Sequence, residues 1–241
     1  MRVLDIDLDF FLADTCPLAE KGRRPALTGH EPWPAADVRA FLTERCGLSP
    51  ARPVPGRVFE THDGALFLWQ ELLAAGRLAA PFDVTHIDAH SDLGIGRPGP
   101  GIVLNGALCQ RPETRCDGHA YAARGQLDEA NYLLYALAFR WVRRLENVRN
   151  PKSKKDMPAE IVSVRDAAGV PTALRLAPPL PELFEKMNGR EPEIAYREYP
   201  SGADFCAEAP YDFASLAISP RYAPAEADAL VAVFREFIRE I

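Results

Sequence analysis

A buried strand that ends in Asp, His and Asp is the feature of this sequence that most constrains its fold. The run "FDVTHIDAH" (residues 82–90) has the apolar and β-branched character of a core strand. Asp88, His90 and Asp92 follow one another at alternate positions at its end. Because alternate side chains of a strand point to the same face, these three groups are expected to gather there. The pattern predicts a polar site at the end of a buried strand.

Strand-like and helix-like segments alternate along the 241 residues. We expect strands near 2–9, 56–63, 82–90 and 211–219 and a hairpin at 160–177. We expect helices near 35–46, 64–78, 127–145, 181–188 and 223–241, and the end of 127–145 is compatible with a strand as well as a helix. This alternation predicts one α/β domain over residues 1–241, a three-layer α/β/α fold with a mainly parallel central sheet. Ligands of such sheets bind beyond the carboxyl ends of the strands, where Asp88, His90 and Asp92 fall.

A second run of acidic residues stands at the start of the chain, in "VLDIDLDFF". Asp5, Asp7 and Asp9 share one face of the expected strand, and large apolar residues occupy the other. A solvated edge strand is one interpretation. The strongly apolar intervening residues favour a central strand, where unpaired buried anions are very costly. Bound cations would remove that cost.

A histidine between a strand and a helix completes the set. His62, in "FETHDGA", follows one expected strand and precedes a helix, whereas a lone histidine is more often a structural residue with a hydrogen-bond partner. His86 lies deeper in its strand, and we expect it to have a core role. The candidate ligands are thus aspartates and two imidazoles without a thiolate, a combination that suits a hard or borderline divalent ion such as Mn²⁺. They exceed the needs of one ion, so we expect two ions about 3.5–4 Å apart that lower the pKa of a water molecule for attack on an electrophilic carbon.

Composition excludes several other classes. A net charge of −6 argues against a nucleic-acid-binding protein. No apolar stretch approaches the roughly 20 residues needed to span a bilayer, and the acidic start does not have the pattern of a signal peptide. Five cysteines without zinc-finger spacing predict reduced thiols and a cytoplasmic protein. The basic segment "RNPKSKKDMP" (149–158) is expected to be a solvated loop.

These motifs carry a family resemblance. "DAHSD" resembles the DAHxD signature of the arginase (ureohydrolase) superfamily, and "DIDLD" is similar to its DxD strand motif. The arrangement of "LDIDLDFF", "ETHDGAL", "HIDAHSDL", "ANYLLYALA" and "ISPRY" resembles a branch that includes the peptide arginases. The resemblance implies a dimanganese centre held by Asp7, Asp9, His62, Asp88, His90 and Asp92, with Asp5 as an alternative N-terminal ligand.

The same resemblance implies a reaction. Peptide arginases convert arginine side chains of ribosomally made precursor peptides to ornithine and release urea, and Asp92 would then orient the attacking hydroxide and carry a proton. This chain departs from arginases in two ways: its DxD strand precedes DAHxD, and the glutamate that holds the guanidinium has no clear counterpart. Glu60 and Glu129 are the candidates for that role, and Asn105 for a further substrate contact. The alternatives are an amide deacylase with one Zn²⁺ and a non-catalytic metal-binding module.

Overall fold

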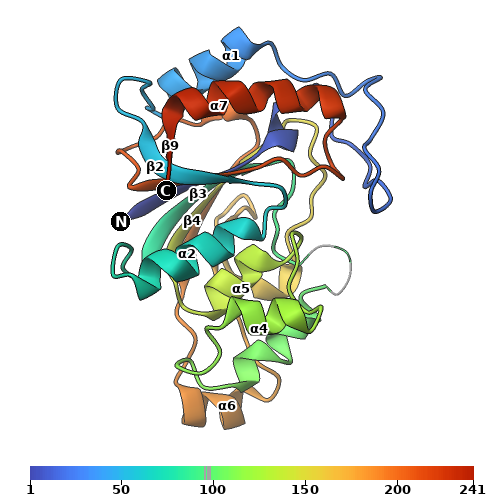
Figure 1. The fold of residues 1–241 in the computed structure, drawn as a ribbon. Coiled ribbons are helices and arrows are strands. Elements are labelled where there is room, and N and C mark those ends of the chain that lie inside the picture. The colour runs from blue at the N-terminus through green and yellow to red at the C-terminus, as the bar shows by residue number, and fades with distance from the viewer. Residues whose placement is uncertain (95, 97–98) are drawn as a thin grey trace.

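The computed structural model of the chain describes residues 1–94, 96 and 99–241 (Figure 1). The strands in this part of the chain are β1 (Arg2–Asp7), β2 (Val54–Phe59), β3 (Phe82–Asp88), β4 (Val142–Arg149), β5 (Val162–Arg165), β6 (Pro171–Leu174), β7 (Ile194–Tyr199), β8 (Phe213–Ala217) and β9 (Ile238–Glu240). The α-helices are α1 (Ala35–Ala40), α2 (Gly64–Ala74), α3 (Gly101–Leu104), α4 (Gly118–Ala123), α5 (Tyr132–Ala138), α6 (Pro181–Asn188) and α7 (Val231–Phe237).

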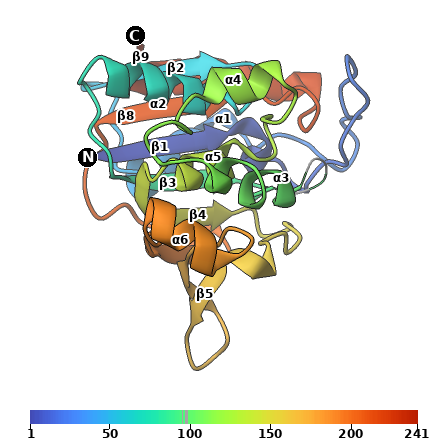
Figure 2. The same ribbon diagram turned by 90° about the horizontal axis from the view of Figure 1, so that it is seen from below.

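The strands form one sheet in the order β5-β6-β7-β4-β3-β1-β8-β2-β9. From β7 to β9 all neighbouring strands are parallel, whereas β6 pairs antiparallel with β5 and with β7 at one edge. The predicted α/β class with a mainly parallel sheet is therefore confirmed. Strand β1 lies in the interior of the sheet between β3 and β8, as Figure 2 shows, so the interpretation of "VLDIDLDFF" as a solvated edge strand is wrong.

Helices cover both faces of the sheet and complete the three layers (Figure 1). Helices α1 and α7 lie on one face, and α2, α4 and α5 lie on the other. Strand β1 faces both layers: Val3 belongs to the core that includes Trp69 of α2, and Leu4 and Ile6 belong to the core that includes Phe234 of α7. The aspartates of β1 therefore point towards the layer of α2 and α5.

Three predicted elements end earlier than the sequence pattern indicated. The first strand ends at Asp7, whose side chain accepts a hydrogen bond from the backbone N–H of Asp9 and caps a buried 3₁₀ turn at Leu8–Phe11. The helix predicted over 127–145 ends at Ala138, since Arg140 adopts a left-handed φ of 61°, and β4 follows. The last helix likewise ends at Phe237, and its final residues pair as β9 with β2.

None of the helices in the part of the chain covered by the structure is long and apolar enough to cross a membrane.

Candidate metal centre

Four neighbouring parallel strands deliver polar residues to one point beyond their carboxyl ends. Asp7 and Asp88 are the last residues of β1 and β3, which pair with each other. His62 follows β2 by three residues, and Ser219 follows β8 by two. The chain leaves β1 for β2 on one side of it and returns as β3 on the other, so the site lies at a topological switch point, where α/β sheets bind their ligands.

Eight buried or nearly buried side chains meet there, and we call them the aspartate–histidine cluster: Asp5, Asp7, Asp9, His62, His86, Asp88, His90 and Asp92. The six predicted metal ligands are all among them. Several subsets of three have ligand atoms close enough together to hold a metal ion. The structure thus contains buried aspartate and histidine groups that could bind a metal.

The imidazole of His62 lies at the centre of the cluster. Its Nδ1 is 3.0 Å from Asp88 Oδ2, 3.0 Å from Asp92 Oδ2 and 3.2 Å from Asp7 Oδ2. Its Nε2 is 3.3 Å from an oxygen of Asp5. Both nitrogens are buried, yet neither has a hydrogen-bond partner. Donor atoms bound at about 2.1 Å and at right angles around one ion are about 3 Å apart, so the spacing around Nδ1 fits a metal ligand set.

A second group adjoins the first through Asp88. Asp9 Oδ2 is 2.9 Å from Nδ1 of His90, and Asp88 Oδ1 is 3.6 Å from the same nitrogen. The backbone N–H of His90 donates to Asp88 Oδ1 at 2.5 Å, and that of Ala89 donates to Asp9 at 3.2 Å. Asp88 therefore directs Oδ2 towards His62 and Oδ1 towards His90, and one carboxylate serves both groups.

Asp5 has a different environment from the other aspartates. It accepts hydrogen bonds from the hydroxyls of Ser215 and Tyr132, both at 2.5 Å, and its Oδ2 is 3.2 Å from Nδ1 of His86. Its oxygens are thus occupied by protein donors, and it positions the two imidazoles, His62 and His86, from behind. Such outer carboxylates fix the orientation of metal-binding histidines. His86 is buried, as predicted for a core residue, and its Nε2 is 3.4 Å from Asp88.

The cluster carries an excess of negative charge. If all five carboxylates ionise, three protonated imidazoles still leave two negative charges. Burial raises the pKa of Asp92 to about 7, and the charge of Asp88 adds to the effect. Burial also raises the pKa of Asp9 well above its usual value, helped by its acidic neighbours. In the described part of the chain these five aspartates form ion pairs with histidines alone.

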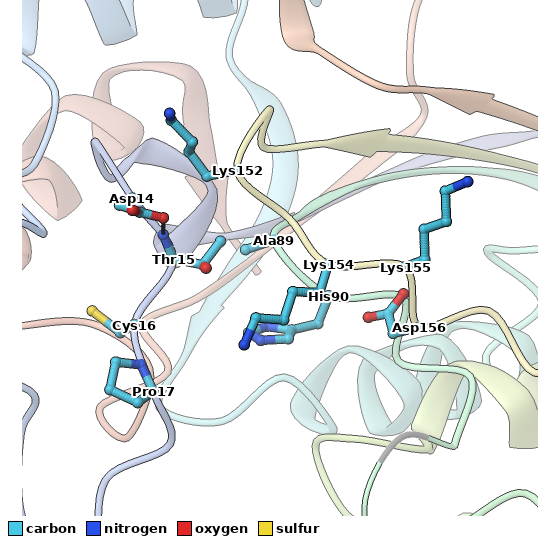
Figure 3. A pocket seen from close by; sticks show the side chains of 10 residues that line it. All are labelled: Asp14, Thr15, Cys16, Pro17, Ala89, His90, Lys152, Lys154, Lys155 and Asp156. Atoms are coloured by element: carbon cyan, nitrogen blue, oxygen red, sulfur yellow. Dashed lines mark hydrogen bonds between the residues drawn. The ribbon is translucent and has the colours of Figure 1, made fainter.

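Solvent reaches the cluster on the side of His90. Its side chain is 23% exposed, whereas that of His62 is only 2% exposed. The ring of Tyr222 packs 4.8 Å from that of His90. His90 also lines a cavity of about 580 Å³, shown in Figure 3.

Two residues of the site have a left-handed backbone that side chains other than glycine seldom adopt. Asp92 has φ 50° and Ser219 has φ 48°. Each such residue costs about 1–3 kcal/mol and persists where the surroundings impose it. The hydroxyl of Ser219 donates to Asp7, and its backbone N–H donates to the carbonyl of Glu60 at 2.9 Å. The sequence analysis did not identify Ser219; the only signal was its place after a buried strand, in "ISPRY".

The three predicted substrate-binding residues have different positions. Glu60 and Asn105 are exposed, and neither side chain hydrogen-bonds to the cluster. Glu129 is 12% exposed, and its Oε1 is 3.4 Å from Arg221 Nη1. Burial raises the pKa of Glu129, and the charge of Asp7 contributes to this effect, so Glu129 lies at the margin of the cluster.

A scan of protein-family models finds none that matches this chain, and a search of curated proteins finds no match either. The function must therefore be inferred from the site itself.

Proposed function

We propose that this protein is a dimanganese hydrolase that cleaves the guanidine group of peptidyl arginine and releases urea. The observation that best supports this proposal is the position of Asp88, which directs one oxygen to each of two ligand groups. A carboxylate between two groups is what a two-ion centre requires. The oxygen-rich donor set with imidazoles favours Mn²⁺ over ions that prefer thiolates.

Six residues would hold the ions. His62, Asp7 and Asp88 would hold one ion, with Asp92 next to His62, and Asp9, His90 and Asp88 would hold the other. Bound there, two divalent ions would activate water and stabilise the negative charge that develops during its attack.

The reaction adds water to the guanidinium carbon of the substrate arginine and breaks the bond between that carbon and Nε. The nitrogen leaves as the ornithine amine and takes up a proton, and the carbon leaves in urea. Asp92 is the residue assigned to that proton, because its Oδ2 faces the same position as Asp88 Oδ2 and its side chain is more exposed. Proton transfer by a positioned carboxylate typically contributes about 10²–10⁴-fold to a rate.

Glu129 is the candidate to hold the substrate guanidinium. It contacts the guanidinium of Arg221 through one oxygen at a long 3.4 Å, so its carboxylate is already next to a group of this kind without a close bidentate pair. Bidentate pairing with carboxylates is the strong mode of guanidinium binding. The side chain of Glu60 is exposed, whereas that of Glu129 is only 12% exposed, so Glu129 is favoured over Glu60.

The buried histidines disfavour the alternative of an amide deacylase that uses paired histidines as acid and base. His62 and His86 stack on each other with ring centroids 5.2 Å apart, but both are buried. Neither of these two imidazoles is exposed for proton exchange with a substrate.

The test uses purified protein loaded with Mn²⁺ and an arginine-containing peptide. We expect about two ions per chain by elemental analysis, urea in solution, and a mass loss of roughly 42 Da per converted arginine. Faster turnover of free arginine or agmatine would move the assignment to a small-molecule ureohydrolase. Reaction with acetyl-lysine peptides in place of guanidines would establish the deacylase, and metal binding without any turnover would establish a non-catalytic module.

A further inference from the structure

The basic segment between β4 and the β5–β6 hairpin is part of the site's entrance. We define the lysine loop as residues 150–157. Its three lysines, Lys152, Lys154 and Lys155, line the same cavity of about 580 Å³ as His90. Figure 3 shows Lys154 and His90 in the middle of that cavity, with the other two lysines on either side of them in this view. The expectation of a loop that is only solvated therefore needs revision.

Buried contacts fix the loop to the two chain segments that carry the cluster. Asn150 Nδ2 donates to the carbonyls of Phe10 and Leu12, both at 2.9 Å, next to the turn that holds Asp9. At the other end, Asp156 accepts from the backbone N–H of Ser91 at 2.9 Å, between two of the proposed metal ligands. A loop tied at both ends to the site holds its side chains at a fixed place beside it.

The charge of the lysines is available to a ligand. In the part of the chain that the structure describes, no ion pair involves Lys152, Lys154 or Lys155, and all three are exposed. Of the two aspartates that line the cavity, Asp156 is paired with Arg149 at 3.0 Å. Among the described residues that line this cavity, Asp14 is then the one carboxylate left to offset three cations.

A second cavity lies against the same loop. It has a volume of about 520 Å³ and shares Lys154, Lys155 and Asp156 with the cavity at His90. Arg149 and Arg165 also line it, and Nη1 of the buried Arg149 has no hydrogen-bond partner. Glu198 and Asp156 line it too, so among the described residues the two cavities together have five lysines and arginines against three carboxylates.

We propose that the lysine loop binds acidic residues of the peptide substrate that flank the reactive arginine. This inference rests on the proposed function, because it assigns the substrate's neighbouring residues to a place beside the same centre. The occupant is an extended acidic peptide: two cavities along one loop suit a chain rather than a single small anion, and lysines without ion pairs attract carboxylates. The cluster itself is negative and would repel such residues, so the lysines also separate the acidic flank from the metal ligands.

The experiment uses labelled ten-residue peptides with one central arginine. Two of them carry three glutamates, one before the arginine and the other after it. Each is compared with a counterpart in which glutamine replaces glutamate. Binding to the Mn²⁺-loaded protein is measured by fluorescence anisotropy, and urea release is measured in parallel. We expect one of the two acidic-flank peptides to bind roughly tenfold more tightly than its glutamine counterpart, since three exposed ion pairs each contribute a modest amount. High salt should remove most of this preference.

Reversal of the charge of two lysines tests whether the lysine loop itself recognises the acidic flank of the peptide. The double substitution Lys154→Glu and Lys155→Glu should abolish the preference for glutamate and favour a peptide with lysine on the same flank. Lys186→Glu, on the exposed face of α6 outside both cavities, is the matched control and should retain the preference for glutamate.

The outcomes separate this inference from the proposed function. Equal binding of the glutamate and glutamine peptides, with urea released from both, would overturn the docking site and leave the hydrolase intact. Preferential binding of the acidic peptide without urea would support the docking site and overturn the hydrolase. A single-stranded RNA of equal charge that binds as tightly as the acidic peptide would overturn the assignment to peptides.

Discussion

Two buried charged clusters in this protein are built on opposite plans. Near α6, Glu191 receives two guanidiniums: Arg115 pairs with it bidentately at 2.9 and 2.7 Å, and Arg140 binds it at 3.0 and 3.1 Å. These contacts hold the pKa of Glu191 below its usual value against the opposing effect of burial. The aspartate–histidine cluster has five carboxylates, and its ion pairs within the described chain are all to histidine.

The difference separates a structural cluster from one whose groups could bind a metal ion. The charge of Glu191 is satisfied by protein groups alone, so the cluster near α6 contributes to folding and has no use for an added ion. The aspartate–histidine cluster leaves negative charge and both nitrogens of His62 without hydrogen bonds in a buried place. Such a deficit is costly unless a cation is bound. The following predictions test this contrast.

The largest effect is expected for Asp88→Asn, because it changes the carboxylate that serves both groups. Metal content should fall below one ion per chain, and urea release should fall by more than about 100-fold, since even outer partners of metal ligands are worth 10–100-fold. Elemental analysis and a urea assay measure this. Near-normal metal content in Asp88→Asn would contradict the two-ion arrangement.

Glu191→Gln should lower the stability of the fold and leave metal binding unchanged. Removal of one partner from a buried ion pair leaves the other charge uncompensated, and Arg115 is fully buried. We expect a loss of about 3–5 kcal/mol in the free energy of unfolding, measured by chemical denaturation, with metal content per folded chain unchanged. A loss of metal without a loss of stability would show that the two clusters are not independent.

Asp5 and Asp9 provide a test within the aspartate–histidine cluster. Asp5 positions histidines, so Asp5→Asn should weaken metal binding by about 10–100-fold. Asp9→Asn removes a ligand and should weaken it more. Isothermal titration of metal-free protein with Mn²⁺ ranks the two variants. The reverse ranking would show that Asp5 is the ligand and that Asp9 has the supporting role.

The smallest effect is expected at Ser219, which donates to Asp7 from a left-handed backbone. Ser219→Ala and Ser219→Gly both remove the hydroxyl and should weaken Mn²⁺ binding by about tenfold. Only glycine relieves the backbone strain, so Ser219→Gly should unfold at a higher temperature than Ser219→Ala, by a stability difference of about 1 kcal/mol. Equal metal affinity in wild type and both variants would remove Ser219 from the site.

The sequence predicted the parallel sheet and the candidate ligands because both have local signals. A buried strand shows itself by apolar residues, and polar residues at its end, such as Asp88 after "FDVTHI", stand out against them. The alternation of side chains along a strand, however, places Asp5, Asp7 and Asp9 on one face. It does not separate a metal ligand from a supporting residue. Tyr132 and Ser215, which surround Asp5, come from distant segments, so its supporting position emerges only in the folded chain.

Other features had no local signal at all. The 3₁₀ turn after β1 depends on tertiary cover for Phe10 and Phe11, which the alternating pattern does not reveal. The lysine loop reads as a solvated segment, since its anchors, Asn150 and Asp156, bond to backbone atoms far away in sequence. The residue types of the loop do not reveal hydrogen bonds to backbone atoms that are distant in sequence.

The convergence of β1, β2 and β3 on one point has a consequence for how the protein assembles. Asp7 and Asp88 are 81 residues apart (88 − 7), and His62 lies between them, so an ion bound by all three closes long loops of the chain. Loop closure of this length is entropically expensive, and parallel strand pairing is slow for the same reason. The metal centre is therefore completed late in folding, after the central strands have paired. An ion bound there would act as a reversible cross-link, so we expect the melting temperature to rise with the logarithm of metal concentration and to fall when a chelator removes the metal.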